Sequence, residues 1–432
     1  MQNQRRPKQN QTRETGEYTK VYKNQLLQSV RGPQPELALQ SFYGHMSSLC
    51  CRPGAFIGPS HLNAIIGATA KAWKLAQARL TQQKQEHAQH QMHTFLIGMF
   101  ERLWTLLPDV EERQAANILW SSAQLELNPD ALLPGMTDSL ARQFMLDMDA
   151  AIGQGFANIL VACAKLQLSP CQGKLVKVIL NRLATADLSN FEPQHMSNTL
   201  HSLAIIPAAA PSVEVLDALC HRFGVLLNSR QAVELPNAQN IANTMWALSK
   251  LKHAPSDELT MSMVGRMVAL CCVPGQQPTP QSISNVLLAC AQLRLPVQQA
   301  DTDSLASCFL SSNRRQATQQ EYANTAWSLA VIGRLSQTQL TLMLDQLFAL
   351  SGKPSEMLIP PQLTNAELTH LYQALDWLQP PSSALAQQQS AWFSLQVRLH
   401  RLGPRPAPDR PSISSNSKLC AALNQLHLPL RP

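Results

Sequence analysis

Aromatic residues, charged residues and long apolar runs are all scarce in this 432-residue sequence. Phe, Trp and Tyr make up only 5% of the chain although hydrophobic residues make up 45%, so apolar burial must depend mainly on Leu, Ala, Val, Ile and Met. Because Ala, Leu and Met are good helix formers, this composition predicts a helical protein. No apolar run approaches the roughly 18 residues of a transmembrane helix, so we expect no membrane partner.

The sequence also lacks the usual signatures of disulfide frameworks, metal sites and catalytic sites. Its ten cysteines show no CxxC spacing near metal-spaced histidines, so we expect buried thiols in a reducing intracellular compartment. Phosphate-loop, dinucleotide-binding and HExxH motifs are absent. His87, His90 and His93 have helical spacing in a Gln-rich stretch, where a weak surface metal site is the less favoured alternative. We therefore predict no enzymatic activity, no cofactor and no bound metal.

The positive charge is concentrated at the two ends of the chain. The formal net charge is +7. Residues 1–52 carry eight Lys and Arg against three acidic residues, and residues 401–432 carry five against one. The middle holds 22 basic and 24 acidic residues. A basic surface in the middle would therefore require positive and negative charges to be sorted between faces.

A short phrase with an invariant Asn recurs through the middle of the chain. An apolar residue follows the Asn after two positions, a mostly bulky residue after three, and small residues after four and six. The Asn residues are 54, 41, 40, 45, 42 and 39 positions apart: Asn63, Asn117, Asn158, Asn198, Asn243, Asn285 and Asn324. A degenerate copy follows Thr364. Since small residues let a neighbouring helix approach closely, each phrase predicts one largely buried helix.

A second, amphipathic segment lies upstream of each phrase, and Pro and Gly mark the joints. Each repeat is therefore expected to be a helix pair with the buried helix second. One pair cannot cover its own apolar faces, so we predict an all-α fold, an α-solenoid (superhelix) of about seven to eight helix-pair repeats of roughly 40 residues.

The predicted array spans residues 35–395. A disordered, basic, Gln-rich tail is expected at residues 1–34, and a Pro- and Ser-rich tail with room for one short helix at residues 396–432. The buried second helices are expected near residues 60–73, 114–127, 155–168, 195–206, 240–252, 282–295, 321–333 and 365–378.

The phrase resembles the octotricopeptide repeat, which is related to the repeat region of FAST-kinase-like and RAP-domain proteins. The best matching segments are residues 236–251, 191–204 and 319–330, and the resemblance extends from about Pro35 to Leu378. It implies RNA binding and a role in RNA stability, processing, splicing or translation. Many members of the family end in a nuclease-like RAP domain. The 54 residues after Leu378 are Pro- and Ser-rich, and we recognise no RAP domain in them.

Two sets of repeat positions are interpreted as structural. The invariant Asn cannot encode which base is bound, so we expect it to form hydrogen bonds between neighbouring repeats. Trp120, Trp246 and Trp327 share their position with aliphatic residues of other repeats. We therefore expect these tryptophans to fill the core. Stacking on bases is the alternative.

The candidates for RNA contacts come from analogy with helical-repeat proteins that read one base per repeat. The variable residue at the start of the second helix is the candidate base reader, at Gln114, Gly155, His195, Asn240, Ser282 and Glu321. Phosphate contacts require cations, for which the candidates are Lys174, Lys177, Arg182, Arg222, Arg266, Arg314 and Arg315. This hypothesis fails if the cations are scattered over both faces of the array.

The leading hypothesis is a non-catalytic RNA-binding protein of post-transcriptional control, with single-stranded RNA as its partner. A protein–protein interaction scaffold, including a bacterial effector exported into a host cell, is the alternative, because solenoids also bind peptides and partner helices. The compartment stays open between an organelle (mitochondrion or chloroplast) of a eukaryote and the cytoplasm or host cell of a bacterium.

Overall fold

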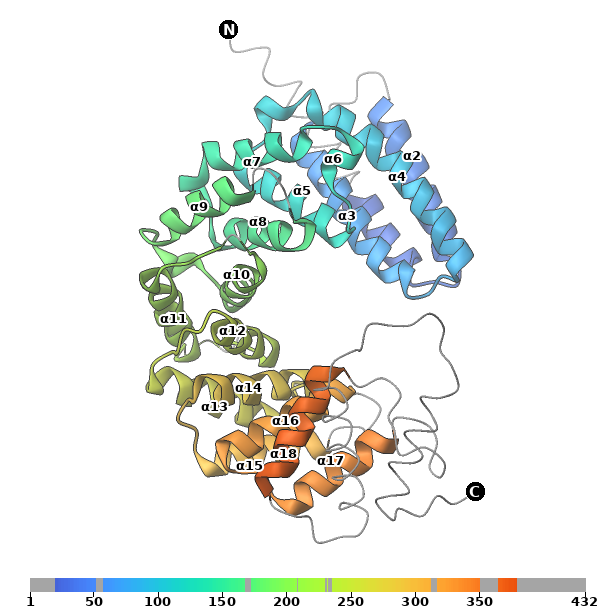
Figure 1. Ribbon diagram of the computed structural model, residues 1–432. Helices are drawn as coiled ribbons and strands as arrows, with labels where there is room; N and C mark the ends of the chain where they lie inside the picture. Colours follow the sequence, from blue (N-terminus) through green and yellow to red (C-terminus); the bar gives the residue numbers. More distant parts are fainter. Residues whose placement is uncertain are drawn as a thin grey trace, which may run out of the picture. The chain divides into compact units, whose positions relative to one another are not determined.

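The structure is a computed structural model, and the residues that it describes are 20–51, 57–167, 172–207, 209–229, 231, 235–311, 317–349 and 364–378. Every secondary-structure element in these ranges is a helix (Figure 1). The predicted all-α fold is therefore confirmed. The chain divides into two compact units, unit 1 (Met1–Leu235) and unit 2 (Pro236–Pro432).

Unit 1 contains an inner and an outer row of helices (Figure 1). The inner helices pack side by side in chain order: α3 (Pro59–Gln77), α5 (Glu112–Gln124), α8 (Gly153–Leu166) and α10 (Pro193–Ile205). The outer helices are α2 (Pro35–Cys51), α4 (Gln82–Trp104), α7 (Met136–Leu146), α9 (Gln172–Leu183) and α11 (Val213–Leu227). Short helices lie in the connections: η1 (Leu107–Asp109), α6 (Pro129–Leu132), η2 (Met148–Ala150) and η3 (Leu188–Asn190).

Unit 2 repeats this arrangement. Its inner helices again pack in chain order: α12 (Ala238–Lys250), α14 (Pro280–Leu293), α16 (Gln319–Ile332) and α18 (Asn365–Leu378). The outer helices are α13 (Asp257–Cys271), α15 (Gln299–Ser311) and α17 (Gln337–Ala349). Each unit is thus a stack of helix pairs of the α-solenoid type, as the repeated phrase predicts.

The pairing of helices differs from the expectation that the buried helix comes second. Helices α8, α10, α12, α14 and α16 pack mainly against neighbouring inner helices, and among the outer helices each contacts chiefly the one that follows it. The long gap between the first two phrases is also explained, because α3 has 19 residues and α4 has 23, whereas α9 has 12 and α11 has 15. Longer helices therefore occupy the additional residues there.

Helix α8 makes a close contact at its first residue. A Cβ atom added at Gly153 would lie 2.8 Å from the Phe191 ring and 2.9 Å from the Phe191 Cα atom. The Gly153 N–H donates to Asn190 Oδ1 at 3.0 Å. Only Gly lets the start of α8 approach the loop before α10 so closely, which fixes the spacing of these two inner helices.

The inner helices share a C-terminal cap in the left-handed conformation. It falls nine residues after the Asn in five repeats, at Glu126, Gln167, Lys252, Arg294 and Gly333. The characteristic bond to the carbonyl five residues back is present, for example from His253 N–H to Leu248 O at 3.0 Å. The repeat around Asn198 has Pro207 at this register and lacks the cap.

Part of the predicted N-terminal tail is ordered. Residues 20–29 are helical, and the side chains of Leu26 and Val30 are buried with 3% and 0% of their surface exposed. These apolar contacts were hidden in the sequence by the surrounding Lys and Gln residues. The predicted tail at residues 396–432, together with 379–395, lies outside the described residues.

Candidate nucleic-acid interface on the inner helices

The position predicted to read bases forms the N-terminal cap of the inner helices. This position is the third residue of the helix. In a capping box its side chain accepts a hydrogen bond from the backbone N–H of the residue just before the helix. Glu111 N–H donates to Gln114 Oε1 at 3.3 Å, Asn237 N–H to Asn240 Oδ1 at 3.1 Å, and Thr318 N–H to Glu321 Oε2 at 2.8 Å.

The histidine and serine at this position also belong to caps. Glu192 N–H donates to His195 Nδ1 at 3.2 Å. Burial lowers the pKa of His195, which keeps this nitrogen unprotonated and able to accept. Ser282 Oγ lies 3.0 Å from Thr279 Oγ1, which in turn accepts the Ser282 N–H. Any acceptor side chain satisfies this role, so capping accounts for the variation among these five repeats without a ligand, whereas Gly155 of α8 forms no such cap.

The candidate cations that the structure describes all lie on outer helices. Lys174 and Lys177 are exposed on α9. Arg182, also on α9, forms an ion pair with Asp149 at 2.9 Å. Arg314 and Arg315 lie outside the described residues.

Two further candidate arginines hold the loops that precede inner helices. Arg222 of α11 donates to Ser189 O at 2.6 Å and to Phe191 O at 2.9 Å, just before α10. Arg266 of α13 donates to Pro236 O at 3.4 Å, just before α12. Together with Arg182, these residues recur at one register of the outer helices and join each outer helix to its inner partner. The structure thus gives these three arginines contacts within the chain.

The repeated Asn lies at the centre of a strip that is partly exposed on most inner helices, although Asn158 and Asn324 themselves are buried. Asn158 Nδ2 donates to Asn117 Oδ1 of the preceding inner helix at 2.8 Å. In the degenerate last copy His370 takes the place of Asn, and its Nδ1 lies 3.0 Å from Asn324 Oδ1. Hydrogen bonds therefore connect neighbouring repeats at this register. The remaining members of the set are half-buried: Asn63, Asn198, Asn243 and Asn285.

The three repeat tryptophans are not fully buried, in contrast to the expectation that they fill the core. Trp120, Trp246 and Trp327 are each partly exposed one turn after the Asn. Trp327 stacks on His370 with ring centroids 4.8 Å apart and planes 21° apart. Its Nε1–H donates to Gln373 Oε1 at 2.7 Å. The sequence pattern did not predict this exposure, because aliphatic residues occupy the same repeat position elsewhere and suggested a buried position.

We call the exposed strip of each inner helix the inner ridge. It comprises four registers: Gln four residues before the Asn, the Asn itself, and the residues three and seven positions after it. The Gln is exposed in most repeats: Gln194, Gln239, Gln281 and Gln320. Lys165 and Lys250 stand at the last register. The Lys250 ammonium lies 5.7 Å from the centre of the Trp246 ring. Amides, aromatic rings and cations are thus adjacent on the ridge.

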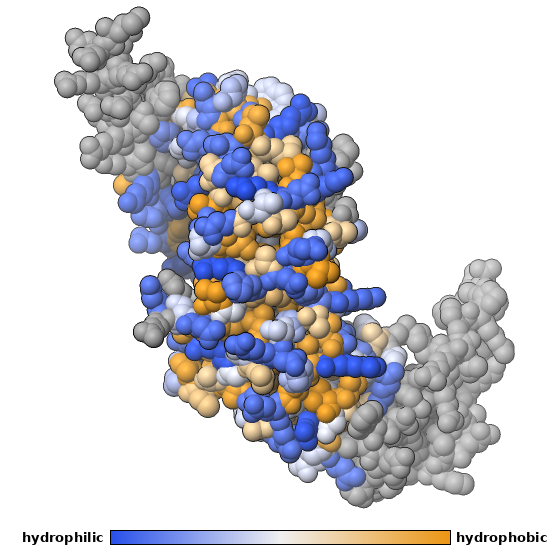
Figure 2. Space-filling view, turned by 90° about the vertical axis from the view of Figure 1, so that its left-hand side faces the viewer, coloured by the Kyte–Doolittle hydropathy of each residue, from blue (hydrophilic) through white to orange (hydrophobic). Residues whose placement is uncertain are grey.

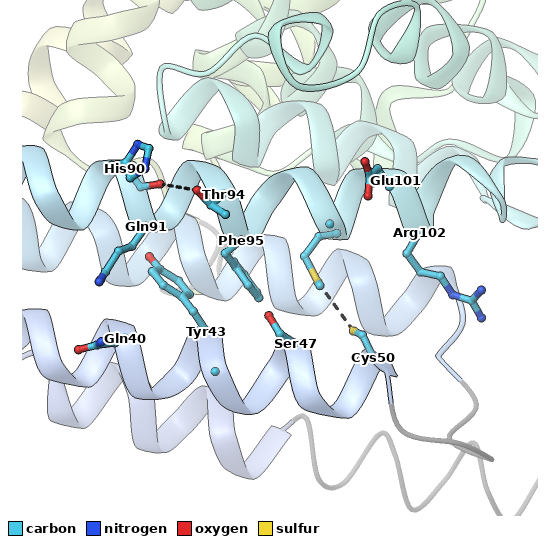
Figure 3. A pocket seen from close by; sticks show the side chains of 13 residues that line it. Gln40, Tyr43, Ser47, Cys50, His90, Gln91, Thr94, Phe95, Glu101 and Arg102 are labelled. Carbon is cyan, nitrogen blue, oxygen red and sulfur yellow. Dashed lines mark hydrogen bonds between the residues drawn. The ribbon is translucent and has the colours of Figure 1, made fainter.

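A second surface feature lies on the outer side of unit 1. Helices α2 and α4 border a groove of about 700 Å³ (Figure 3). Tyr43 and Phe95 stack across it with centroids 4.7 Å apart, and Cys50 Sγ lies 3.8 Å from Met99 Sδ. Gly98 leaves its rim open, since an added Cβ would meet no atom within 4 Å. The groove therefore has an apolar floor and an open rim.

The outer helices expose separate apolar side chains. Val213 of α11 and Met261 of α13 are 60% and 44% exposed. On the side of the molecule shown in Figure 2, hydrophilic residues interrupt the hydrophobic surface. Exposed apolar residues are normal on protein surfaces, so among the described residues we single out the inner ridge and the α2–α4 groove for their composition.

The described residues contain no group of three or more His, Cys, Asp or Glu side chains that could hold a metal ion. Among the described helices none is long and apolar enough to cross a membrane. The sequence matches no protein-family model and no curated protein.

Proposed function

We propose that this chain is a non-catalytic protein that binds single-stranded RNA along its inner ridge and acts in post-transcriptional control. The observation that carries the proposal is the recurrence of exposed Gln and repeat Asn amides on successive inner helices, together with partly exposed indole rings on α5, α12 and α16. On α12 a cation, Lys250, also lies 5.7 Å from the centre of the Trp246 ring. Side-chain amides can both donate and accept hydrogen bonds, as the edges of unpaired bases require. Exposed indole rings provide surfaces on which bases of any sequence can stack.

The charge on α12, α14 and α16 supports the same partner, whereas α18 carries Glu367 and Asp376. Among α12, α14 and α16 the only acidic residue is Glu321, and its carboxylate is engaged in the cap of α16. A polyanion can therefore approach these helices with little electrostatic repulsion. The charge balance of the middle of the chain does not reveal this difference between inner and outer helices. Most of its acidic residues lie on outer helices and loops.

The test is binding of the full chain to a random pool of single-stranded RNA, followed by affinity measurements on an enriched sequence. Replacing an indole that stacks on a base should weaken binding by about 1–3 kcal/mol, or about 5- to 150-fold. We expect this loss for Trp246→Ala. Trp104 of α4 is 42% exposed on an outer helix, so Trp104→Ala is the matched control and should bind normally. Absence of enrichment, or equal losses in both variants, would contradict the proposal.

The α2–α4 groove favours a second function, that of a protein-binding scaffold. An apolar floor with small rim residues suits an amphipathic partner helix. The variant Gly98→Met would fill the groove without a clash, since the position is open. A scaffold that uses this groove should lose its protein partner in this variant while its RNA affinity stays unchanged.

A further inference from the structure

The C-terminal ends of the inner helices in unit 2 carry a row of cations that the sequence analysis did not identify. Lys252 and Arg294 both stand nine residues after the repeat Asn, and Arg334 stands ten residues after it. None of the three forms an ion pair with another described residue. Arg334 donates instead to the neutral amide of Gln299 at 3.0 Å.

We propose that Lys252, Arg294 and Arg334 form a phosphate track, on which the backbone of a single-stranded RNA lies while its bases face the inner ridge. This inference rests on the proposed function and deepens it, since it assigns the two chemical parts of the strand to two parallel rows of residues. The rows are about 9 Å apart, because six residues separate the ring register from the cation register and an α-helix rises about 1.5 Å per residue.

The packing of unit 2 repeats the row in space. Helices α12, α14 and α16 pack side by side, and neighbouring helix axes are typically about 8–10 Å apart. Lys252 and Arg294 also share one backbone conformation, with φ of 55° and 53°. Lys252 and Arg294 therefore leave their helices at the same point, and Arg334 follows one residue after this register on α16.

Opposing effects on stability act at the positions of these cations. A cation at a helix C-terminus is stabilised by the helix dipole. An L-residue in the left-handed conformation is strained, which Gly avoids, as at Gly333 in the same register of α16, although Gly loses more chain entropy on folding. These effects oppose one another, and contact with an anion gives the positive charge a further role.

The corresponding edge of unit 1 has a mixed charge. Glu126 occupies the cap register of α5. Burial lowers the pKa of Lys165, and the nearby charge of Lys74 lowers it further, whereas Glu126 opposes this shift. The track is consequently assigned to unit 2, where the C-terminal cap residues of α12, α14 and α16 include no acidic residue.

The test compares how RNA binding depends on salt in two double variants of the full chain. Lys252→Gln with Arg294→Gln removes two charges from the track. Gln167 already occupies this register in α8 with φ of 48°, so the substitution suits the backbone. Lys174→Gln with Lys177→Gln is the control, because it removes two exposed charges from an outer helix. The probe is a fluorescent single-stranded RNA from the enriched pool.

Each lost phosphate contact should reduce the slope of log affinity against log salt by about 0.7. We expect a reduction of about 1.4 for the track variant and none for the control. An unchanged slope in the track variant, with RNA still bound, would overturn the phosphate track but leave the proposed function intact. An equal reduction in both variants would also overturn it, because the attraction would then be diffuse. Failure of the unaltered chain to bind RNA would refute the proposed function itself.

Discussion

The hydrogen bond between Asn158 and Asn117 should be measurable as a coupling between two substitutions. The donor lies 2.8 Å from the acceptor, and Asn158 has only 9% of its surface exposed. A neutral hydrogen bond of this kind contributes a net stabilisation of about 0.5–1.5 kcal/mol. Since Asn117 is half-exposed, water can replace its lost partner, so the cost of breaking the bond should stay near the middle of that range.

A single substitution would understate this effect. Replacing Asn by Ala in a helix interior gains up to about 0.7 kcal/mol of helix propensity, which offsets much of the lost hydrogen bond. In a double-mutant cycle the propensity gains cancel, and the coupling energy remains. We therefore expect Asn158→Ala and Asn117→Ala to show small separate effects and a coupling of about 1 kcal/mol.

The assay is urea unfolding followed by far-ultraviolet circular dichroism for the single and double variants. The matched control is the same cycle at Asn243 and Asn285. These residues occupy the same register of neighbouring inner helices, but no hydrogen bond joins their amides in the described structure. Their coupling should be close to zero. Equal coupling energies in both cycles, or no coupling between Asn158 and Asn117, would refute the idea that the repeated Asn amide stabilises the stack of inner helices through this hydrogen bond.

Three further substitutions test local features of the fold by urea unfolding. Gly153→Ala should destabilise by about 1–3 kcal/mol through overpacking, whereas Gly155→Ala, whose added Cβ would lie 3.6 Å from its neighbours, should be neutral or stabilising; equal effects would contradict the contact. Gln167→Gly should stabilise by about 0.5–1 kcal/mol, because relief of the left-handed strain at φ 48° is partly offset by the greater chain entropy that Gly loses on folding; a loss would disprove the strain. Burial raises the pKa of Cys290 from 9.0 to about 12, so stability should be complete below pH 9 and fall as the pH rises towards 12. Cys290→Ala should flatten that profile, and an unchanged profile would contradict it.

The sequence predicted the inner helices well because their pattern is repeated and locally consistent. The helix expected near residues 240–252 spans Ala238–Lys250, and the one expected near 282–295 spans Pro280–Leu293. The shift of about two residues has one cause. The capping residues at each start are polar and variable, so the apolar phrase alone places the helix too late.

The candidate site was harder to predict, because local and long-range roles look alike in a sequence. Variation at His195 and Asn240 resembles a recognition code, yet each side chain completes a cap that accepts several residue types. The pattern Thr-x-x-Glu at Thr318 and Glu321 is a known signature of a capping box. Where the residue before the helix is Glu192 or Asn237, the signature is less obvious, and only the structure reveals the shared geometry.

The cations illustrate the opposite difficulty. Arg222 and Arg266 are prominent in amphipathic outer helices, but their guanidinium groups hold loops within the chain. Lys252 and Arg294 stand in short connections where basic residues attract little notice. Counting from the repeated Asn places both at one register, and this signal was available in the sequence. Their common left-handed backbone conformation was not.

A position that distinguishes bases must vary between repeats, be exposed, and have no essential structural role. The Asn fails the first condition, and the capping residue fails the third. In six of the seven repeats the register seven residues after the Asn satisfies the first two: Gln124, Lys165, Ile205, Lys250, Gln292 and Val331, of which all but Gln124 are exposed. In the first repeat this register is the buried Ala70. The register lies between the partly exposed rings and the cations of the helix ends. If the inner ridge discriminates between RNA sequences, exchanging Lys250 for the Gln of the next repeat should alter the preferred base without altering the stability of the stack.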